Sequence, residues 1–170
     1  DFSKTALNGK RINNPDQDSI AYVAIHGIPH TQIHEVKDYF APYVRERNKR
    51  NRLMLDNINQ ILKPFGIYLD FEYDVVPISK SHEGGSITER HLLYALSLKL
   101  VEKYEKGERL VDFLKKDLKL QVNPRVESYL LDGDNPFYEY DLLGLLKSDL
   151  VAQFYIDATL ECPDVKEVVE

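Results

Sequence analysis

The fold of this chain is decided by the stretch SITERHLLYALSLKLVEKYEK, residues 86–106. It opens with a capping box, in which Ser86 accepts from the amide of Glu89 while the Glu89 side chain reaches back to the amide of Ser86. Behind the box the predicted helix is apolar on nearly all sides, which is typical of a helix buried all round. The residues concerned are Ile87, Leu92, Leu93, Ala95, Leu96, Leu98, Leu100 and Val101. We therefore predict a central, buried helix here.

The chain on both sides of this helix also has the apolar spacing of helices. We predict helices over residues 32–40, 42–62, 108–118, 124–131 and 137–150. Pro42 is expected to end or kink the first of these, because proline lacks the amide that a helix interior uses. Residues 66–78 alternate apolar and acidic side chains, and this period of two predicts an extended, half-buried segment.

Two strands are predicted at the borders of the helical region. Ile20–Ile28 is rich in Ile, Val and Tyr and nearly continuous in apolar character, which indicates a strand buried on both faces. Gln153–Ala158 is also strand-like, and a helix cut short by the end of the sequence begins after Pro163. The expected fold class is mainly α with flanking strands, in which a helical cap or insertion block is attached to pieces of an α/β layer.

This layout predicts three parts. Residues 1–34 are a loop and a buried strand of the parent α/β layer. Residues 35–150 are the helical cap block. Residues 151–170 are a strand and the start of a helix.

Composition excludes several classes of protein. The net charge of -6 argues against general nucleic-acid binding, which needs a positive surface. No apolar run is long enough to cross a membrane, and the first residues lack the apolar centre of a signal peptide. Cys162 is the only cysteine, so we expect no disulfide framework and a cytoplasmic location. Met54 is the only methionine, and we therefore expect the chain to be part of a longer protein.

Three of the five histidines, His26, His30 and His34, lie at the end of the first predicted strand. Such a position suits metal binding or proton transfer, because the strand fixes the side chain while the loop admits substrate. Gly27 and Pro29 interrupt any helix that would align the three rings. Two interpretations of His26 stay open: a metal ligand or a hydrogen-bonded structural residue. A site made by all three histidines requires a bend at Gly27–Pro29.

A second candidate is a group of five cations within eight residues of a predicted helix: Arg45, Arg47, Lys49, Arg50 and Arg52. The planar guanidinium group matches the geometry of phosphate, so this stretch is either a phosphate-facing patch or a solvated helix face. His91 lies on the first turn of the central helix, where it either faces a phosphate or a reacting oxygen or packs in the core. Cys162 has no histidine close to it in sequence, and a structural role is the simpler interpretation.

The order of several motifs resembles a known family. The motifs are YVAIHGI (22–28), RERNKRNR (45–52), INQIL (58–62), GIYLDF (66–71) and SITERHLLYAL (86–96). Together they are similar to the middle of bacterial proteins of the PHP (polymerase and histidinol phosphatase) superfamily. These are metal-dependent phosphoesterases with a distorted β/α barrel, and many carry an inserted helical cap. His26-Gly27-Ile28 looks like the family's strand that carries a metal-ligand His. His91 looks like the His that opens a later helix of the family. This chain departs from the family there, because Glu89-Arg90 stands where the family has Gly-Arg-Pro.

The resemblance implies a function for the intact protein. Divalent zinc, manganese or iron ions would bind there, with His26 as one ligand, and a phosphorylated small molecule or nucleotide would be hydrolysed. Arg47, Arg50 and Arg52 would hold the substrate phosphate, and His91 would act beside it. We expect the other ligand motifs of the family to lie before Asp1 and after Glu170, and the chain alone to be inactive. The alternative is a non-catalytic helical module that binds a partner or the rest of its own polypeptide.

Overall fold

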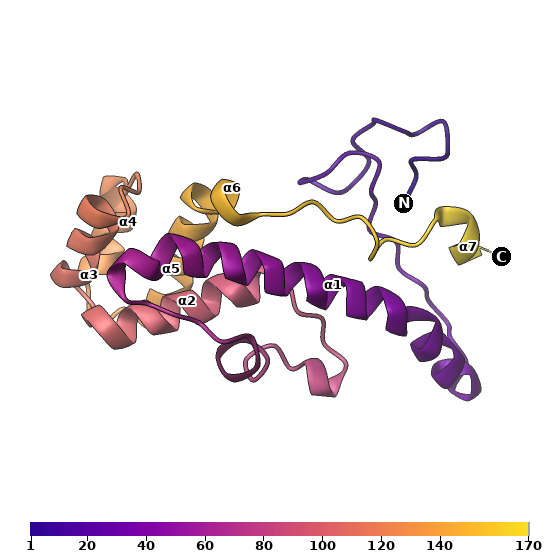
Figure 1. Cartoon of the computed structure of the whole chain (residues 1–170), viewed down its shortest axis with the longest axis horizontal. Coiled ribbons are helices and arrows are strands. Elements are labelled where there is room, and N and C mark those ends of the chain that lie inside the picture. The colour runs from indigo at the N-terminus through magenta and orange to yellow at the C-terminus, as the bar shows by residue number, and fades with distance from the viewer. Residues whose placement is uncertain (170) are drawn as a thin grey trace. The chain divides into compact units, whose positions relative to one another are not determined.

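The computed structural model describes residues 1–169 and is mainly helical, as the apolar spacing predicted (Figure 1). The α-helices are α1 (Ile33–Leu62), α2 (Glu89–Tyr104), α3 (Glu108–Asp112), α4 (Pro124–Leu131), α5 (Tyr138–Asp149), α6 (Val151–Phe154) and α7 (Val165–Val169). Short 3-10 helices are η1 (His30–Gln32), η2 (Lys63–Phe65) and η4 (Ser81–Glu83). Single π-helical turns are η3 (Phe71–Val75) and η5 (Phe113–Asp117).

The chain divides into two compact units. Unit 1 consists of Asp1–Arg50 and Ile156–Glu170, and unit 2 consists of Asn51–Tyr155. Helix α1 contributes its first part to unit 1 and its second part to unit 2. Each unit is described separately below.

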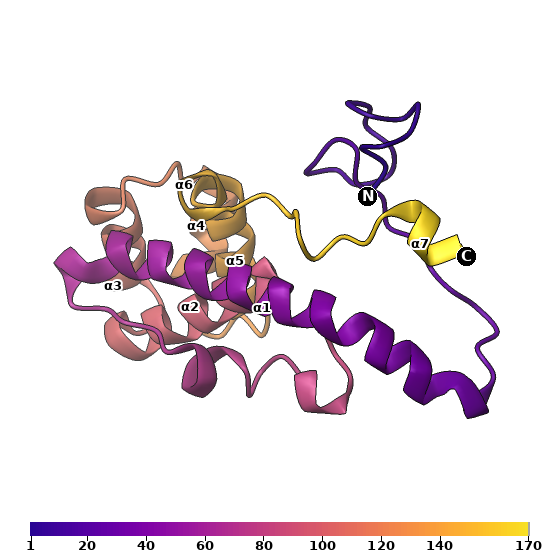
Figure 2. The same cartoon turned by 45° about the vertical axis from the view of Figure 1, so that its right-hand side comes forward.

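Unit 2 is a helical block built around α2. Helix α2 packs against α5 and α3, and α4 packs against α3 and α5. Figures 1 and 2 both show α2 and α5 next to each other. The fully buried side chains of these helices and of α1 include Met54, Ile58, Leu62, Leu92, Leu93, Leu96, Leu100, Leu142 and Leu146. Burying each of them stabilises the fold by roughly 1.5–3 kcal/mol, which makes this block the main core of the protein.

Unit 1 consists of an N-terminal and a C-terminal segment of the chain, and hydrogen bonds join the two segments. The Gln17 side-chain amide donates to the Ala158 carbonyl at 2.6 Å, and the Ala158 amide donates back to Gln17 Oε1 at 2.9 Å. The amide of Val165 donates to the carbonyl of Asp1 at 3.0 Å. Residues 155–164 run between α6 and α7 without regular structure (Figure 2). These long-range bonds compensate for the small number of buried apolar residues in unit 1.

The capping box of α2 lies two residues later than predicted. Thr88, not Ser86, is the N-cap, and His91, not Glu89, is the partner at the third helical position. The apolar residues explain this register. Ile87 and Leu92 are both buried, and with Thr88 as the cap they occupy the two positions whose contact forms a hydrophobic staple. A cap at Ser86 would place Gly85 and Arg90 there instead.

The predicted strands are wrong, because no part of residues 1–169 forms a β-strand. Ile20–Ile28 is irregular chain, and only Tyr22 bonds through its backbone there, to the side chain of Asn13. In Gln153–Ala158 the first two residues belong to α6 and the rest are irregular. A strand is stable only when its amides and carbonyls meet a neighbouring strand, and the described part of the chain offers none to either segment.

The expected extended segment at residues 66–78 contains the π-helical turn η3 instead. The Asp70 carboxylate caps this turn by accepting from the amides of Glu72 and Tyr73 at 2.8 and 2.9 Å. Phe71 and Val75 are buried while Tyr73 between them is 85% exposed. The alternating pattern therefore belongs to a capped turn and not to a strand. An aspartate side chain can bind nearby amides and so favour a turn over extended backbone.

Pro42 does not end the predicted helix, because α1 runs continuously from Ile33 to Leu62 with Pro42 inside it. Proline leaves the carbonyl four residues earlier, that of Asp38, without its helical donor. Asp38 is exposed, so water can satisfy this carbonyl. The helix therefore tolerates this proline, whereas a helix whose carbonyl at this position was buried would be broken by it.

Candidate functional site

The histidines of the predicted metal site lie in unit 1, at the entrance to α1. His26 is on the irregular segment, His30 begins η1 and His34 is in the first turn of α1. All three are exposed, and Gly27 between the first two has a φ of 74°, a left-handed conformation that favours glycine. Within residues 1–169 no three His, Cys, Asp or Glu side chains are arranged to hold a metal ion. His26 is accessible as a ligand but does not share a site with His30 and His34.

Arg50 is one of the three predicted phosphate-binding arginines, and it faces into unit 1. Its Nε donates to Glu161 Oε1 at 2.5 Å, and its Nη1 donates to the Ile156 carbonyl at 2.7 Å. The two side chains of the ion pair are 15% and 5% exposed. A carboxylate that is this well buried needs a cation beside it, since an unpaired buried charge is strongly destabilising. Arg50 therefore fixes the C-terminal segment onto α1.

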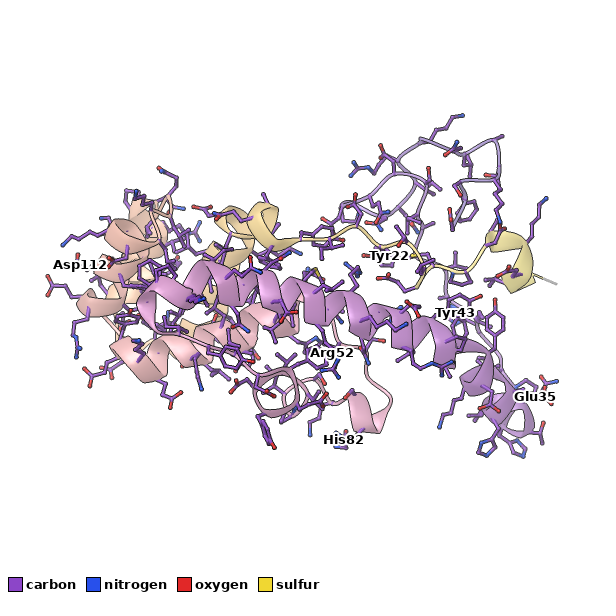
Figure 3. All side chains as sticks on the ribbon, in the orientation of Figure 1. Tyr22, Glu35, Tyr43, Arg52, His82 and Asp112 are labelled. Atoms are coloured by element: carbon purple, nitrogen blue, oxygen red, sulfur yellow. The ribbon has the colours of Figure 1, made fainter. Side chains whose placement is uncertain are left out.

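Arg52 belongs to unit 2 and has a different environment. Its Nη2 forms an ion pair with Glu72, and its guanidinium carbon lies 4.0 Å from the centre of the Phe71 ring. In Figure 3 the labelled Arg52 points from α1 toward the π-helical turn that carries both partners. The side chains of Arg52 and Glu72 are about half exposed, so solvent screens the pair, and its contribution to stability is small.

Arg47 lines a groove of about 370 Å³ within unit 1. The groove is mostly apolar and is walled by the irregular segment, by Phe40 of α1 and by the residues around Cys162. Burial raises the pKa of the Cys162 thiol, and neighbouring Glu161 raises it further. The thiol is therefore protonated at neutral pH and a poor nucleophile, which agrees with a structural role.

His91 is half-buried at the start of α2 in unit 2, where it completes the capping box. Its Nδ1 accepts from the Thr88 amide at 3.1 Å and lies 3.2 Å from Thr88 Oγ1. Burial lowers the pKa of His91, while the nearby Glu89 carboxylate acts in the opposite direction. Because Nδ1 is an acceptor, the neutral ring carries its proton on Nε2.

The predicted site residues are thus spread over two units. His26, Arg47 and Arg50 belong to unit 1, and Arg52 and His91 belong to unit 2. Two residues with important contacts were missed from the sequence. Glu161 is separated from Arg50 by 111 positions and gives no local signal. Thr88 could have been found, because Ile87 and Leu92 have the spacing of a hydrophobic staple around it.

Neither the family models, the curated proteins nor the solved structures compared with this chain give a match. Among the described residues, no helix is both long enough and apolar enough to cross a membrane.

Proposed function

We propose that this chain is the cap-containing middle of a metal-dependent phosphoesterase of the PHP type, which hydrolyses a phosphorylated small molecule or nucleotide when its parent protein is complete. Two features of the sequence support the proposal: the order of its motifs and the position of His26 in YVAIHGI. In this proposal, unit 2 is the helical cap, and Ile20–Ile28 is one of the barrel segments that carry metal ligands.

The observation that carries the proposal is the state of Ile20–Ile28. Tyr22, Val23, Ile25 and Ile28 are 66%, 63%, 47% and 38% exposed. Residues of this kind are typical of half-buried or buried strands, and exposing several of them in succession is unfavourable. A segment that is β-prone, apolar and without a neighbouring strand fits a strand that pairs elsewhere in the parent protein. Figure 3 labels Tyr22 on this segment.

His26 would then supply one ligand at the end of that strand, and the remaining ligands would come from other segments of the parent. A bound divalent ion would polarise the phosphate ester and activate water. Arg47 lines the same groove as Ile25 and Ile28, and in this proposal it would provide positive charge for the phosphate. Arg50 and Arg52 would have to exchange Glu161 and Glu72 for a phosphate, or act only by positioning the segments they bind.

The test measures metal content and phosphatase activity in the 170-residue chain and in its complete parent protein. We expect the chain alone to bind less than stoichiometric zinc, manganese or iron and not to hydrolyse p-nitrophenyl phosphate. In the parent, His26→Ala should reduce both metal content and activity. His82→Ala is the matched control, because His82 is an exposed histidine of unit 2. Enzyme-like turnover by the isolated chain, or an unchanged parent carrying His26→Ala, would refute the proposal.

The second candidate is a non-catalytic helical interaction module. The observation that favours it is a pair of exposed aromatic residues on unit 2, Phe137 and Tyr140, which are 65% and 63% exposed. Tyr140 also stacks on Tyr94 with ring centres 5.4 Å apart, so its ring is held in place. Rigid aromatic side chains are frequent anchors of protein interfaces. If this is the function, Phe137→Ser and Tyr140→Ser should abolish binding of the partner. The parent protein should then show no phosphatase activity, with or without these substitutions.

A further inference from the structure

The capping box of α2 contains a titratable group where most such boxes have Glu or Gln. The ring of His91 takes the place of that side chain and accepts the Thr88 amide through Nδ1. Glutamine keeps its acceptor at every pH, and glutamate loses its charge only in acid. An ordinary imidazole gains a proton as the pH falls below about 6.5, and its protonated form has no hydrogen-bond acceptor.

We propose that the Thr88–His91 capping box is a pH-sensitive latch, which holds the start of α2 when His91 is neutral and releases it when His91 is protonated. The proposal does not depend on the phosphoesterase function. It rests on the hydrogen bond itself, because protonation of Nδ1 removes the acceptor of the Thr88 amide. The protonated nitrogen can then donate to Thr88 Oγ1, 3.2 Å away, but the amide is left without its partner.

The helix dipole acts in the same direction. The amide groups in the first turn of α2 carry partial positive charge, so a cationic ring at His91 is repelled there. The charged groups at this end of the helix are Glu89 and Arg90 of α2 itself and Lys147 of α5, which lies 3.3 Å from the Glu89 carboxylate. Glu89 favours the protonated ring, but its charge is shared with Lys147. Burial is the largest effect and lowers the pKa of His91, although Glu89 and the Thr88 backbone both act in the opposite direction.

The latch is connected to the rest of unit 2. The carbonyl of Ile87, just before the cap, accepts from the side-chain amide of Asn51 on α1 at 2.9 Å. Both Ile87 and Asn51 are buried. Loss of the cap therefore loosens a point where the preceding loop is fixed to both α1 and α2. Because the pKa of folded His91 is lowered, this stabilisation is present above pH 6.5 and is lost as the pH falls below it.

The test is amide hydrogen exchange measured by NMR on the 170-residue chain at pH 7.5 and pH 5. Protection factors are used, since they correct for the pH dependence of intrinsic exchange. We expect the protection of the Thr88 amide and of the first turn of α2 to fall roughly 5- to 30-fold in the wild type, the effect of losing one cap. In His91→Gln, which retains the acceptor without the titration, protection should change less than twofold.

A second measurement keeps the test valid if His91→Gln does not fold. The ring resonances of wild-type His91 should titrate below pH 6.5, and protection of Thr88 should follow that titration. Titration at or above pH 6.5, or Thr88 protection that stays constant while the ring is protonated, would overturn the proposal. Parallel loss of protection in a folded His91→Gln protein would also overturn it, because another group would then be responsible.

Discussion

The buried ion pair between Arg50 and Glu161 gives the strongest prediction about stability. Glu161→Gln retains the shape of the side chain but leaves the guanidinium of Arg50 with one fewer anionic partner in a site where it is only 15% exposed. Breaking a buried pair typically costs about 3–5 kcal/mol. Arg50 keeps the Ile156 carbonyl at 2.7 Å, so we expect the lower end of this range, about 3 kcal/mol.

The single cysteine provides the assay. Cys162 is adjacent to Glu161, belongs to unit 1 and is partly buried, so a thiol reagent reacts with it mainly after unit 1 opens locally. A loss of about 3 kcal/mol corresponds to a roughly 150-fold faster reaction when the closed form must open first. Removing the Glu161 charge also lowers the thiol pKa, because Glu161 raises it. The rates must therefore be compared after correction for the thiolate fraction, measured from their pH dependence.

The matched control is the double variant Arg50→Met/Glu161→Gln, which removes both charges. Because no unpaired ion remains buried, we expect it to be closer to the wild type than Glu161→Gln alone. A corrected labelling rate for Glu161→Gln within threefold of the wild type would refute the reasoning, since Arg50 and Glu161 would then contribute little to the closure of unit 1.

Three further predictions concern backbone geometry and capping. Gly85→Ala should destabilise the chain by about 1–3 kcal/mol in thermal unfolding, because the added Cβ would lie 2.9 Å from the Ser79 carbonyl oxygen and 3.0 Å from that of Lys80; an unchanged unfolding midpoint would contradict this. Pro42→Ala should stabilise α1 by about 2 kcal/mol, since alanine restores the missing helical amide, and amide exchange in its first half should slow rather than stay constant. Thr88→Ala should cost about 1 kcal/mol of stability while Thr88→Ser costs almost nothing, and equal losses from both would exclude a capping role.

Helix α4 shows how much a local signal can predict. The expected helix over residues 124–131 has the observed bounds, Pro124–Leu131. Asn123 caps it by accepting from the Val126 amide at 3.0 Å, and Pro124 follows at the first helical position. All of the groups that start this helix lie within four residues of one another. Such a helix is readable from the sequence, because its start does not depend on distant parts of the chain.

The contacts of the predicted site residues were harder to predict, because they depend on distant parts of the chain. The spacing of Arg50 and Arg52 on α1 gave no indication that one would meet a buried carboxylate and the other an exposed one. For His91 the sequence left two roles open, and the structure adds a capping role that follows from the shifted register of the box. An ion-pair partner depends on how segments pack, and packing is not contained in the spacing of one helix.

By itself the sequence determined that the chain is mainly helical and where most of its helices lie, because helical hydrogen bonds and caps join residues only a few positions apart. Only the tertiary structure decided that Ile20–Ile28 has no partner strand in the described chain and that Arg50 is bound to Glu161, 111 residues away. A β-prone segment specifies a tendency to pair, but the neighbour that satisfies its amides and carbonyls must come from elsewhere in the fold. The same holds for a charge that is buried on folding, because its partner must be supplied by another segment.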